Sequence, residues 1–267
     1  MNSPTLKLTQ LVKTFDTFTA VNRIDIEVKP GEIFGFLGPN GAGKTTTIKM
    51  IAGLLQPTEG ELSVCGRTMR ENPTYCREST GYIPDRPYLY EKLTGAEYLS
   101  FIASLYRQAV NETDFLSRSQ EYLHYFDLHG WQDNLIESYS HGMRQKLIMT
   151  SIFMLNQPLI VVDEPMIGLD PKSARIVKEL FKVKASEGKA VFLSTHSMEI
   201  AEELCDRITI ISHGSIVASG TVSELKQQQQ CSDTLEDLFL QLTGTFELQE
   251  VIAALRNNQP APVSSRT

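Results

Sequence analysis

The sequence predicts an α/β fold built around a phosphate-binding loop. A glycine-rich loop, residues 38–45, joins an apolar strand-like run to a helix-like run. A second apolar run, 159–162, ends in the acidic pair Asp163 and Glu164, and strand-like and helix-like runs alternate after it. This alternation is typical of a mostly parallel sheet covered by helices.

The glycine-rich loop has the composition of a triphosphate cradle. Glycines let the backbone turn its N–H groups toward a ligand, and the start of the following helix adds partial positive charge. We expect Lys44 to reach the outer phosphates and the Thr45 hydroxyl to ligate Mg²⁺. Apolar residues at 33–37 and helical spacing over 45–55 favour this interpretation over an ordinary glycine-rich turn. The loop reads Gly38, Pro39, Asn40, Gly41, Ala42, Gly43, Lys44, Thr45.

Composition narrows the class of protein. The 267 residues leave one large domain or two small ones open. A net charge of −7 argues against a nucleic-acid partner. The 4 cysteines form no Cys-x-x-Cys pair, which favours a reducing compartment. The first ten residues lack a signal core and no apolar run could span a bilayer, so we expect the chain itself to be soluble.

The N-terminal part is expected to add antiparallel strands to the loop unit. Leu6, Leu8 and Leu11 have the spacing of an edge strand. Residues 24–28 alternate apolar and charged side chains, as a half-buried strand does, and 62–65 form another short strand.

A helical region is predicted between the two apolar strands. Thr94 and Glu97 form a capping box at the start of its first helix. A second helix is expected around 115–126, and a third begins after Ser140 and stops before Pro158. We therefore predict an inserted helical subdomain at about 88–157.

The C-terminal part is expected to continue the strand–helix alternation. The predicted order is a helix at 177–181, a strand at 190–193, a helix at 200–204 and a hairpin over 208–218 that turns at His213 and Gly214. Past residue 220, an apolar stripe at 235–242 favours a packing helix, and the polar residues 259–267 a mobile tail.

Polar residues at strand ends supply the rest of a nucleotide site. We expect Asp163 to hold the metal and Glu164 to polarise the attacking water, although two acids can also merely end a strand. His196 follows a predicted strand at the edge where open sheets bind ligands, and we expect it to contact a γ-phosphate; a structural histidine is the alternative. Ser140 starts a helix, which suits either a phosphate or a simple N-cap.

Together these residues resemble the ATP-binding subunit of an ATP-binding-cassette (ABC) transporter over residues 6–220. The resemblance identifies 38–45 as Walker A, 159–163 as Walker B, Glu164 as the catalytic glutamate, 168–170 as the D-loop and His196 as the switch histidine. It also assigns to the nucleotide site Thr46, next to Thr45, and Phe15, which lies where the family places an adenine-stacking aromatic.

The resemblance implies an α/β P-loop NTPase fold of the ABC ATPase kind: a RecA-like core with an antiparallel β subdomain and an inserted α-helical subdomain. That domain would cover 1–220, followed by a C-terminal helical extension and flexible tail, 221–267. It implies two ATP-binding subunits, identical or different, arranged head to tail, so that Ser140 and Gly142 act on the partner's ATP. A separate integral membrane permease and a peripheral place on the cytoplasmic face of the inner membrane are also implied.

The implied activity is Mg²⁺-dependent hydrolysis of ATP to drive transport. Residues 83–94 and 234–244 look like the branch that serves type-2 exporters and Ecs-like systems, which suggests export. The sequence departs from the family at four positions: Tyr139, His141 and Met143 replace the leucine, a glycine and the glutamine of the signature, and Asp85 replaces the usual Q-loop glutamine. We expect Asp85 to ligate Mg²⁺ or a water, with a loop-capping role as the alternative.

Rival functions fit the sequence less well. A non-transport ABC ATPase of DNA repair or translation would carry a coiled-coil insertion, a Cys-x-x-Cys hook or a second cassette, and none is present. A GTPase would carry an Asn-Lys-x-Asp guanine motif, which is also missing. The intact Lys44, Asp163, Glu164 and His196 argue against a module that has lost hydrolysis. Nothing in the sequence indicates the cargo.

Overall fold

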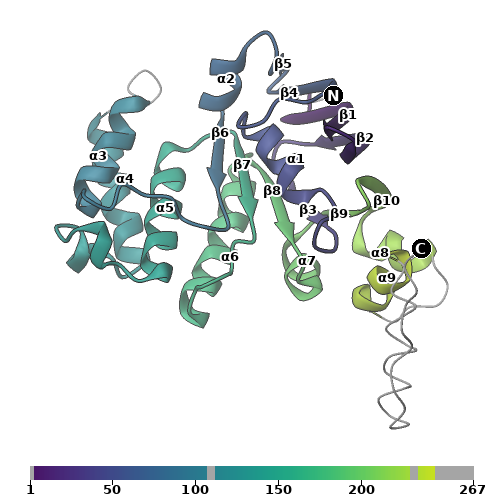
Figure 1. The fold of residues 1–267 in the computed structure, drawn as a ribbon. Coiled ribbons are helices and arrows are strands. Elements are labelled where there is room, and N and C mark those ends of the chain that lie inside the picture. The colour runs from purple at the N-terminus through teal and green to yellow at the C-terminus, as the bar shows by residue number, and fades with distance from the viewer. Residues whose placement is uncertain (1–2, 107–111, 229–233, 244–267) are drawn as a thin grey trace.

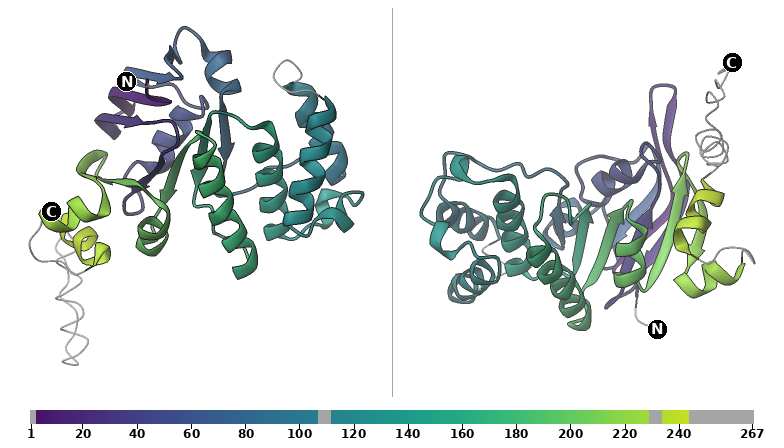
Figure 2. Two further views of the ribbon diagram at one scale, coloured as in Figure 1. Left: turned by 180° about the vertical axis from the view of Figure 1, so that it is seen from behind. Right: turned by 90° about the horizontal axis from the view of Figure 1, so that it is seen from below.

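The computed structural model describes residues 3–106, 112–228 and 234–243 of the 267-residue chain. Two β-sheets form the centre of the molecule, and helices cover both faces of the larger one (Figure 1 and Figure 2). Helices α3, α4 and α5 gather at one side, and α8 and α9 lie at the opposite side (Figure 1). This mixed α/β architecture confirms the predicted fold class.

The larger sheet is parallel and carries the site. Its strand order is β10-β9-β3-β8-β7-β6, and every neighbouring pair is parallel except β9 and β10. Strands β3, β7 and β8 are buried along their whole length, as expected for strands covered on both faces. The predicted C-terminal hairpin is confirmed as β9 and β10. The bounds are β3 Ile33–Leu37, β6 Thr80–Ile83, β7 Leu159–Asp163, β8 Ala190–Thr195, β9 Arg207–Ser212 and β10 Ser215–Gly220.

The smaller sheet is antiparallel, with the order β2-β1-β4-β5. The prediction that residues 6–11 form an edge strand is wrong, because β1 pairs with β2 on one side and β4 on the other. Alternating apolar residues indicate that one face of a strand is buried, but they do not indicate whether the strand has a neighbour on one side or on both. The bounds are β1 Leu6–Phe15, β2 Phe18–Val28, β4 Glu59–Val64 and β5 Arg67–Thr68.

The helices begin and end close to their predicted signals. The capping box is present: Thr94 Oγ1 accepts from the Glu97 N–H at 3.1 Å, and the Thr94 N–H donates to Glu97 Oε2 at 2.8 Å. Helix α1 is shorter than the predicted 45–55, because it ends at Ile51 and Gly53 then adopts a φ of 70°. The bounds are α1 Lys44–Ile51, α2 Pro73–Glu78, α3 Gly95–Leu105, α4 Glu112–Tyr125, α5 His141–Leu155, α6 Pro171–Ser186, α7 Met198–Leu204, α8 Val222–Gln228 and α9 Leu235–Leu242.

Alternation along the central strands divides the core between the two faces of the larger sheet. Phe34, Phe36 and Phe192 pack toward α1 and the smaller sheet. Ile33 and Leu193 lie in the other cluster, with α5 and α6. Both faces therefore hold the carboxyl ends of β3, β7 and β8 rigidly in place.

The C-terminal helices share a third apolar cluster with the larger sheet. Leu235 and Leu238 of α9 are buried against Ile208 and Ile210 of β9. The packing helix expected at 235–242 is thus present. The division of the chain at residue 220 and the extent of the subdomain at 88–157 remain predictions, and the tail predicted at 259–267 lies outside the described residues.

Candidate nucleotide site

Three neighbouring parallel strands deliver the predicted site residues to one edge of the sheet. In the register of the sheet, Leu37 of β3 pairs with Thr195 of β8, and Asp163 of β7 pairs with Ser194. The segments that follow these strands therefore leave the sheet side by side. The glycine-rich loop, the acidic pair and His196 are brought together in this way.

The glycine-rich loop is shaped by positions that exclude a side chain. A Cβ at Gly43 would lie 2.5 Å from the Ala20 carbonyl oxygen, and the φ of Gly43 is 108°. A Cβ at Gly38 would lie 2.4 Å from the Ile211 carbonyl oxygen. These glycines let the loop pack directly against β2 and β9, which fixes the cradle before a ligand arrives.

Lys44 is held inside this loop by backbone oxygens. Its Nζ donates to the carbonyl oxygens of Gly38 at 2.6 Å and Pro39 at 3.1 Å, and the residue is only 8% exposed. Burial lowers the pKa of Lys44, while the carboxylates of Glu164 and Asp163 oppose that shift. The Lys44 ammonium group therefore already lies inside the loop in which we expect it to bind phosphate.

Thr45 and Asp163 form a pair of hard oxygen ligands. Thr45 Oγ1 donates to Asp163 Oδ2 at 3.1 Å, and Asp163 is 2% exposed at the end of β7. Burial raises the pKa of the Asp163 carboxyl, and the hydrogen bond from Thr45 opposes the shift. A buried carboxylate beside a hydroxyl and a phosphate cradle fits the oxygen chemistry of Mg²⁺.

Glu164 and His196 form a second contact at the same edge. His196 Nδ1 lies 2.7 Å from Glu164 Oε1, and Thr195 Oγ1 donates to Glu164 Oε2 at 3.2 Å. Glu164 has a φ of 50°, and its N–H donates to the Ser194 carbonyl at 3.0 Å. The carboxylate thereby contacts an exposed histidine.

Asp85 lies apart from these contacts. Within the described structure it forms no hydrogen bond with Thr45 or Asp163, although its negative charge helps to raise the pKa of Asp163. The preceding Pro84 is tied to α5, because the fully buried Gln145 donates from Nε2 to the Pro84 carbonyl at 3.0 Å. The metal role of Asp85 stays a prediction.

The signature segment contacts the D-loop of its own chain. Ser140 is the N-cap of α5, its Oγ accepting from the Met143 N–H at 3.3 Å. A Cβ at Gly142 would lie 2.7 Å from the Gly168 carbonyl oxygen. The ring of His141 packs on Gly168, where an added Cβ would come within 2.5 Å of Cδ2. The close approach explains why Gly142 is a glycine while position 141 accommodates a side chain.

Phe15 and Thr46 are the remaining residues predicted for the nucleotide site. Phe15 ends β1 with 45% exposure, available for stacking, and Thr46 follows Thr45 in α1. Their nucleotide roles stay predictions. Sequence patterns did not single out Thr195 or Gln145; a polar residue at a strand end and a glutamine on the buried side of a helix were the available signals.

Comparisons with known proteins identify the family of this chain. The family model described as ABC transporter matches residues 21–167. The ABC-type transporter ATP-binding protein EcsA of Bacillus subtilis (strain 168) is 35% identical over 84% of this chain and 90% of its own length. The linearmycin resistance ATP-binding protein LnrL of the same organism is 34% identical over 94% and 79%. The daunorubicin/doxorubicin resistance ATP-binding protein DrrA of Streptomyces peucetius is 36% identical over 81% and 65%.

Solved structures show the same fold. An ATP-binding subunit of an ABC transporter superposes with a TM-score of 0.85 at 33% identity, covering 89% of this chain and 99% of that one. The bacterial ABC transporter cassette MJ0796, solved as a dimer, gives 0.74 at 25% identity over 81% and 98%. It has also been solved in a post-hydrolysis state bound to ADP and Pi. This chain therefore belongs to the ABC transporter family, as an ATP-binding and ATP-hydrolysing subunit of the exporter type.

Proposed function

We propose that two copies of this chain close head to tail over two ATP molecules and drive a separate integral membrane permease. The observation that carries the proposal is the pair of contacts at the cradle, Thr45 with Asp163 and Glu164 with His196. Ser140 bonds to none of these residues within the described structure. Because each chain holds a cradle and a signature serine that do not meet, two identical chains would complete two sites.

The cradle residues divide the work of holding the nucleotide. Lys44 would leave the carbonyl oxygens of Gly38 and Pro39 for the β- and γ-phosphates. Thr45 and Asp163 would hold Mg²⁺, with Asp85 as a further oxygen donor, and that ion would neutralise charge on the phosphate oxygens. Among the described residues, no group of three or more histidine, cysteine or acidic side chains is placed to hold a metal ion. Mg²⁺ keeps waters and substrate oxygens as ligands, so the threonine, the carboxylate and the phosphates would suffice for it.

Glu164 would orient the attacking water. Both of its carboxylate oxygens are engaged, one by His196 and one by the Thr195 hydroxyl. His196 would release Glu164 Oε1 by turning toward the γ-phosphate, so that the carboxylate becomes free to accept a hydrogen bond from water. In this way, binding of the γ-phosphate by His196 would free the Glu164 carboxylate to act as the base.

Ser140 and Gly142 would meet the γ-phosphate of the partner subunit's ATP. The start of α5 offers backbone N–H groups and the positive end of the helix dipole, which favour an anion. Closure of the pair is then favoured by ATP and lost after hydrolysis. Asp85 and the segment tied down by Gln145 would pass this movement to the permease.

The permease and a peripheral place on the cytoplasmic face of the membrane are part of the proposal. No described helix has the length and hydropathy to cross a bilayer. Relatives are named as ATP-binding parts of transporters, and two are named for resistance to toxic compounds. These names and the exporter-type match support outward transport, and the cargo would be chosen by the permease.

Replacement of the proposed base tests the function. Glu164→Gln keeps the shape but accepts a proton poorly, so ATP hydrolysis should fall about 10²- to 10⁴-fold while the affinity for ATP is retained. Glu199→Gln, an exposed neighbour in α7, is the matched control and should hydrolyse ATP normally. Phosphate release and nucleotide binding would both be measured on the purified chains. Normal turnover by Glu164→Gln would refute the assignment.

A further inference from the structure

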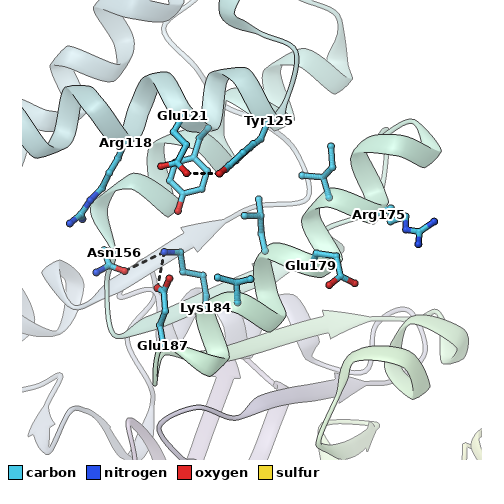
Figure 3. A pocket seen from close by; sticks show the side chains of 12 residues that line it. Arg118, Glu121, Tyr125, Asn156, Arg175, Glu179, Lys184 and Glu187 are labelled. Carbon is cyan, nitrogen blue, oxygen red and sulfur yellow. Dashed lines mark hydrogen bonds and ion pairs between the residues drawn. The ribbon is translucent and has the colours of Figure 1, made fainter.

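A cavity lies away from the residues of the candidate nucleotide site. It has a volume of about 740 Å³ and is walled by one face of α4, one face of α6 and the end of α5 (Figure 3). None of its lining residues belongs to the cradle, the acidic pair or the signature segment. Its size falls in the range of pockets that take small organic ligands, roughly 300–1,000 Å³.

The carboxylates of this cavity already have partners. Glu121 accepts a hydrogen bond from the Tyr125 hydroxyl. Glu179 pairs with Lys182 at 3.1 Å, and Glu187 pairs with Lys184 at 2.9 Å. Each carboxylate thus has a partner, but Tyr125 is neutral and leaves the negative charge of Glu121 in place.

Two arginines of the cavity have no such partner. Within the described part of the chain, the guanidinium of Arg118 forms only a 3.5 Å hydrogen bond to the Met154 carbonyl, and that of Arg175 forms no ion pair. The lining as a whole is neutral, with three cationic and three anionic side chains, and Arg118 is the cation beside Lys184 that has no ion pair among the described residues. Figure 3 shows Arg118 at one end, near Asn156 and Lys184, and Arg175 at the other end, pointing away from them.

The Arg118 end also holds Lys184 and Asn156. Lys184 is only 6% exposed, and its Nζ reaches Glu187 and, at 3.5 Å, the side-chain oxygen of Asn156. Contact with Asn156 through oxygen leaves the amide N–H₂ of that side chain available to an acceptor. Lys184 is balanced by Glu187, so Arg118 is the cation of this end whose guanidinium has no ion pair within the described residues.

An apolar strip continues from that end along the cavity. Tyr122 of α4 is 7% exposed, while Leu180 of α6 is partly exposed and Val183 is 47% exposed. Helix α4 thus leaves part of the apolar face of α6 uncovered. A hydrocarbon body would bury this strip at a gain of roughly 25 cal/mol for each Å² removed from water.

We propose that this cavity binds a small amphipathic carboxylate, with its head group at Arg118, Asn156 and Lys184 and its hydrocarbon body along Tyr122, Leu180 and Val183. Such a molecule would bridge α4 and α6, which come from different parts of the fold. The inference is independent of the proposed transport function, because it uses none of the nucleotide-site residues.

Calorimetric titration with decanoate tests the proposal, using the full-length chain. We expect saturable binding of one decanoate per chain, and at least about tenfold weaker binding of decanol, which lacks the charge. Arg118→Glu should weaken decanoate binding about tenfold or more, because it removes a charge-assisted hydrogen bond and adds a repelling carboxylate. Arg175→Glu, the same charge change at the other end of the cavity, is the matched control and should bind within about twofold of the unaltered chain.

Thermal unfolding of both variants would establish that they fold, and Arg118→Gln would replace Arg118→Glu if the latter does not. Absence of saturable decanoate binding would overturn the proposal. Equal affinity for decanol would do so as well, since it would mean that the cationic end plays no part. Equal weakening by Arg118→Glu and Arg175→Glu would also contradict it, because it would place the ligand elsewhere.

Discussion

Glu164 adopts a left-handed backbone conformation that few non-glycine residues take. Its φ of 50° costs roughly 1–2 kcal/mol for an L-residue. The conformation persists because the Glu164 N–H donates to the Ser194 carbonyl and the side chain bonds Thr195 and His196. Backbone strain of this kind collects where geometry serves function.

Gly38 and Gly41 of the cradle should respond differently to an added methyl group. At Gly38 a Cβ would press on the Ile211 carbonyl oxygen at 2.4 Å, whereas at Gly41 a Cβ would meet nothing within 4 Å. Gly38→Ala should therefore destabilise the chain by roughly 1–3 kcal/mol and weaken ATP binding. Gly41→Ala has only its φ of 79° to disfavour it and should lose about 1–2 kcal/mol at most.

Urea unfolding and nucleotide titration of both glycine variants would check this result. A Gly38→Ala chain as stable as the unaltered one would show that the loop does not depend on close contact with β9.

Site residues could be predicted from the sequence where a suitable residue type occurs at a position that the hydrophobic pattern marks as functional. Lys44, Asp163 and His196 each follow an apolar strand, so period and residue type indicated them together. Thr195 could not be assigned to Glu164, because that contact depends on how β7 and β8 pair. Gln145 was equally hidden, since its partner Pro84 lies far away in sequence.

At the scale of elements, the D-loop is anchored by the residue that starts α6. Asp170 accepts from the Ser173 N–H at 2.9 Å and the Ser173 hydroxyl at 2.6 Å, and it pairs with Lys146 of α5 at 2.9 Å. The hydrogen bond from the Ser173 side chain, with further contributions from the other partners, lowers the pKa of Asp170 well below its ordinary value of 3.8. This anchor holds α5 and α6 together at the signature end.

The stability from Asp170 should depend on pH with a definite sign. Because its folded-state pKa is depressed, the folded chain binds fewer protons than the unfolded chain, and the contribution exists above pH 3.8 and is lost as pH falls further. Asp170→Asn should lower the free energy of unfolding near neutral pH by at most about 1 kcal/mol, since the pair is exposed.

Urea titrations of both chains across the acid range would test that sign. The stability gap should close as the pH falls below the ordinary carboxyl pKa. A gap that widens toward acid would contradict the assignment.

The C-terminal helices are fastened to the helix that follows His196. Glu202 of α7 accepts from the Leu235 N–H of α9 at 3.3 Å and pairs with Lys226 of α8 at 2.8 Å. Its neighbour Glu203 pairs instead with Lys178 of α6. Two adjacent glutamates thus bind different elements, which provides a matched comparison.

Glu202→Ala should loosen α9. We expect the amides of α9 to exchange with solvent roughly 2- to 10-fold faster, the effect of losing about one hydrogen bond. Glu203→Ala should leave exchange in α9 unchanged. Hydrogen–deuterium exchange measured by mass spectrometry would report on α9 in each variant. Identical exchange of the α9 amides in Glu202→Ala and Glu203→Ala would refute the role of Glu202.

Helix ends and turns could be predicted where the residues that determine them are close together in the sequence. The capping box at Thr94 and Glu97, the N-cap at Ser140 and the turn at His213 and Gly214 follow from short stretches of sequence. The position of β1 inside its sheet was missed, because its second partner, β4, comes from beyond the glycine-rich loop. Pairing partners are a property of tertiary structure.

At the scale of the whole molecule, the proposed cradle and the proposed signature serine lie in different parts of the fold. Lys44, Asp163 and Glu164 lie at the carboxyl edge of the larger sheet, and Ser140 opens a helix in the separate group of α3, α4 and α5 (Figure 1). MJ0796, which shares the fold, was solved as a dimer. A head-to-tail pair related by a twofold axis would bring each cradle against the partner's signature segment.

Mixing two inactive variants tests this central claim most directly. Lys44→Ala removes the phosphate ligand, Ser140→Ala removes the signature hydroxyl, and each variant alone should hydrolyse ATP slowly. In a mixed pair, one site combines both defects and the other is intact. An equal mixture should regain about a quarter of normal activity, because half of the randomly formed pairs are mixed and each has one intact site of two. Activity no greater than the average of the two variants measured separately would contradict a shared site.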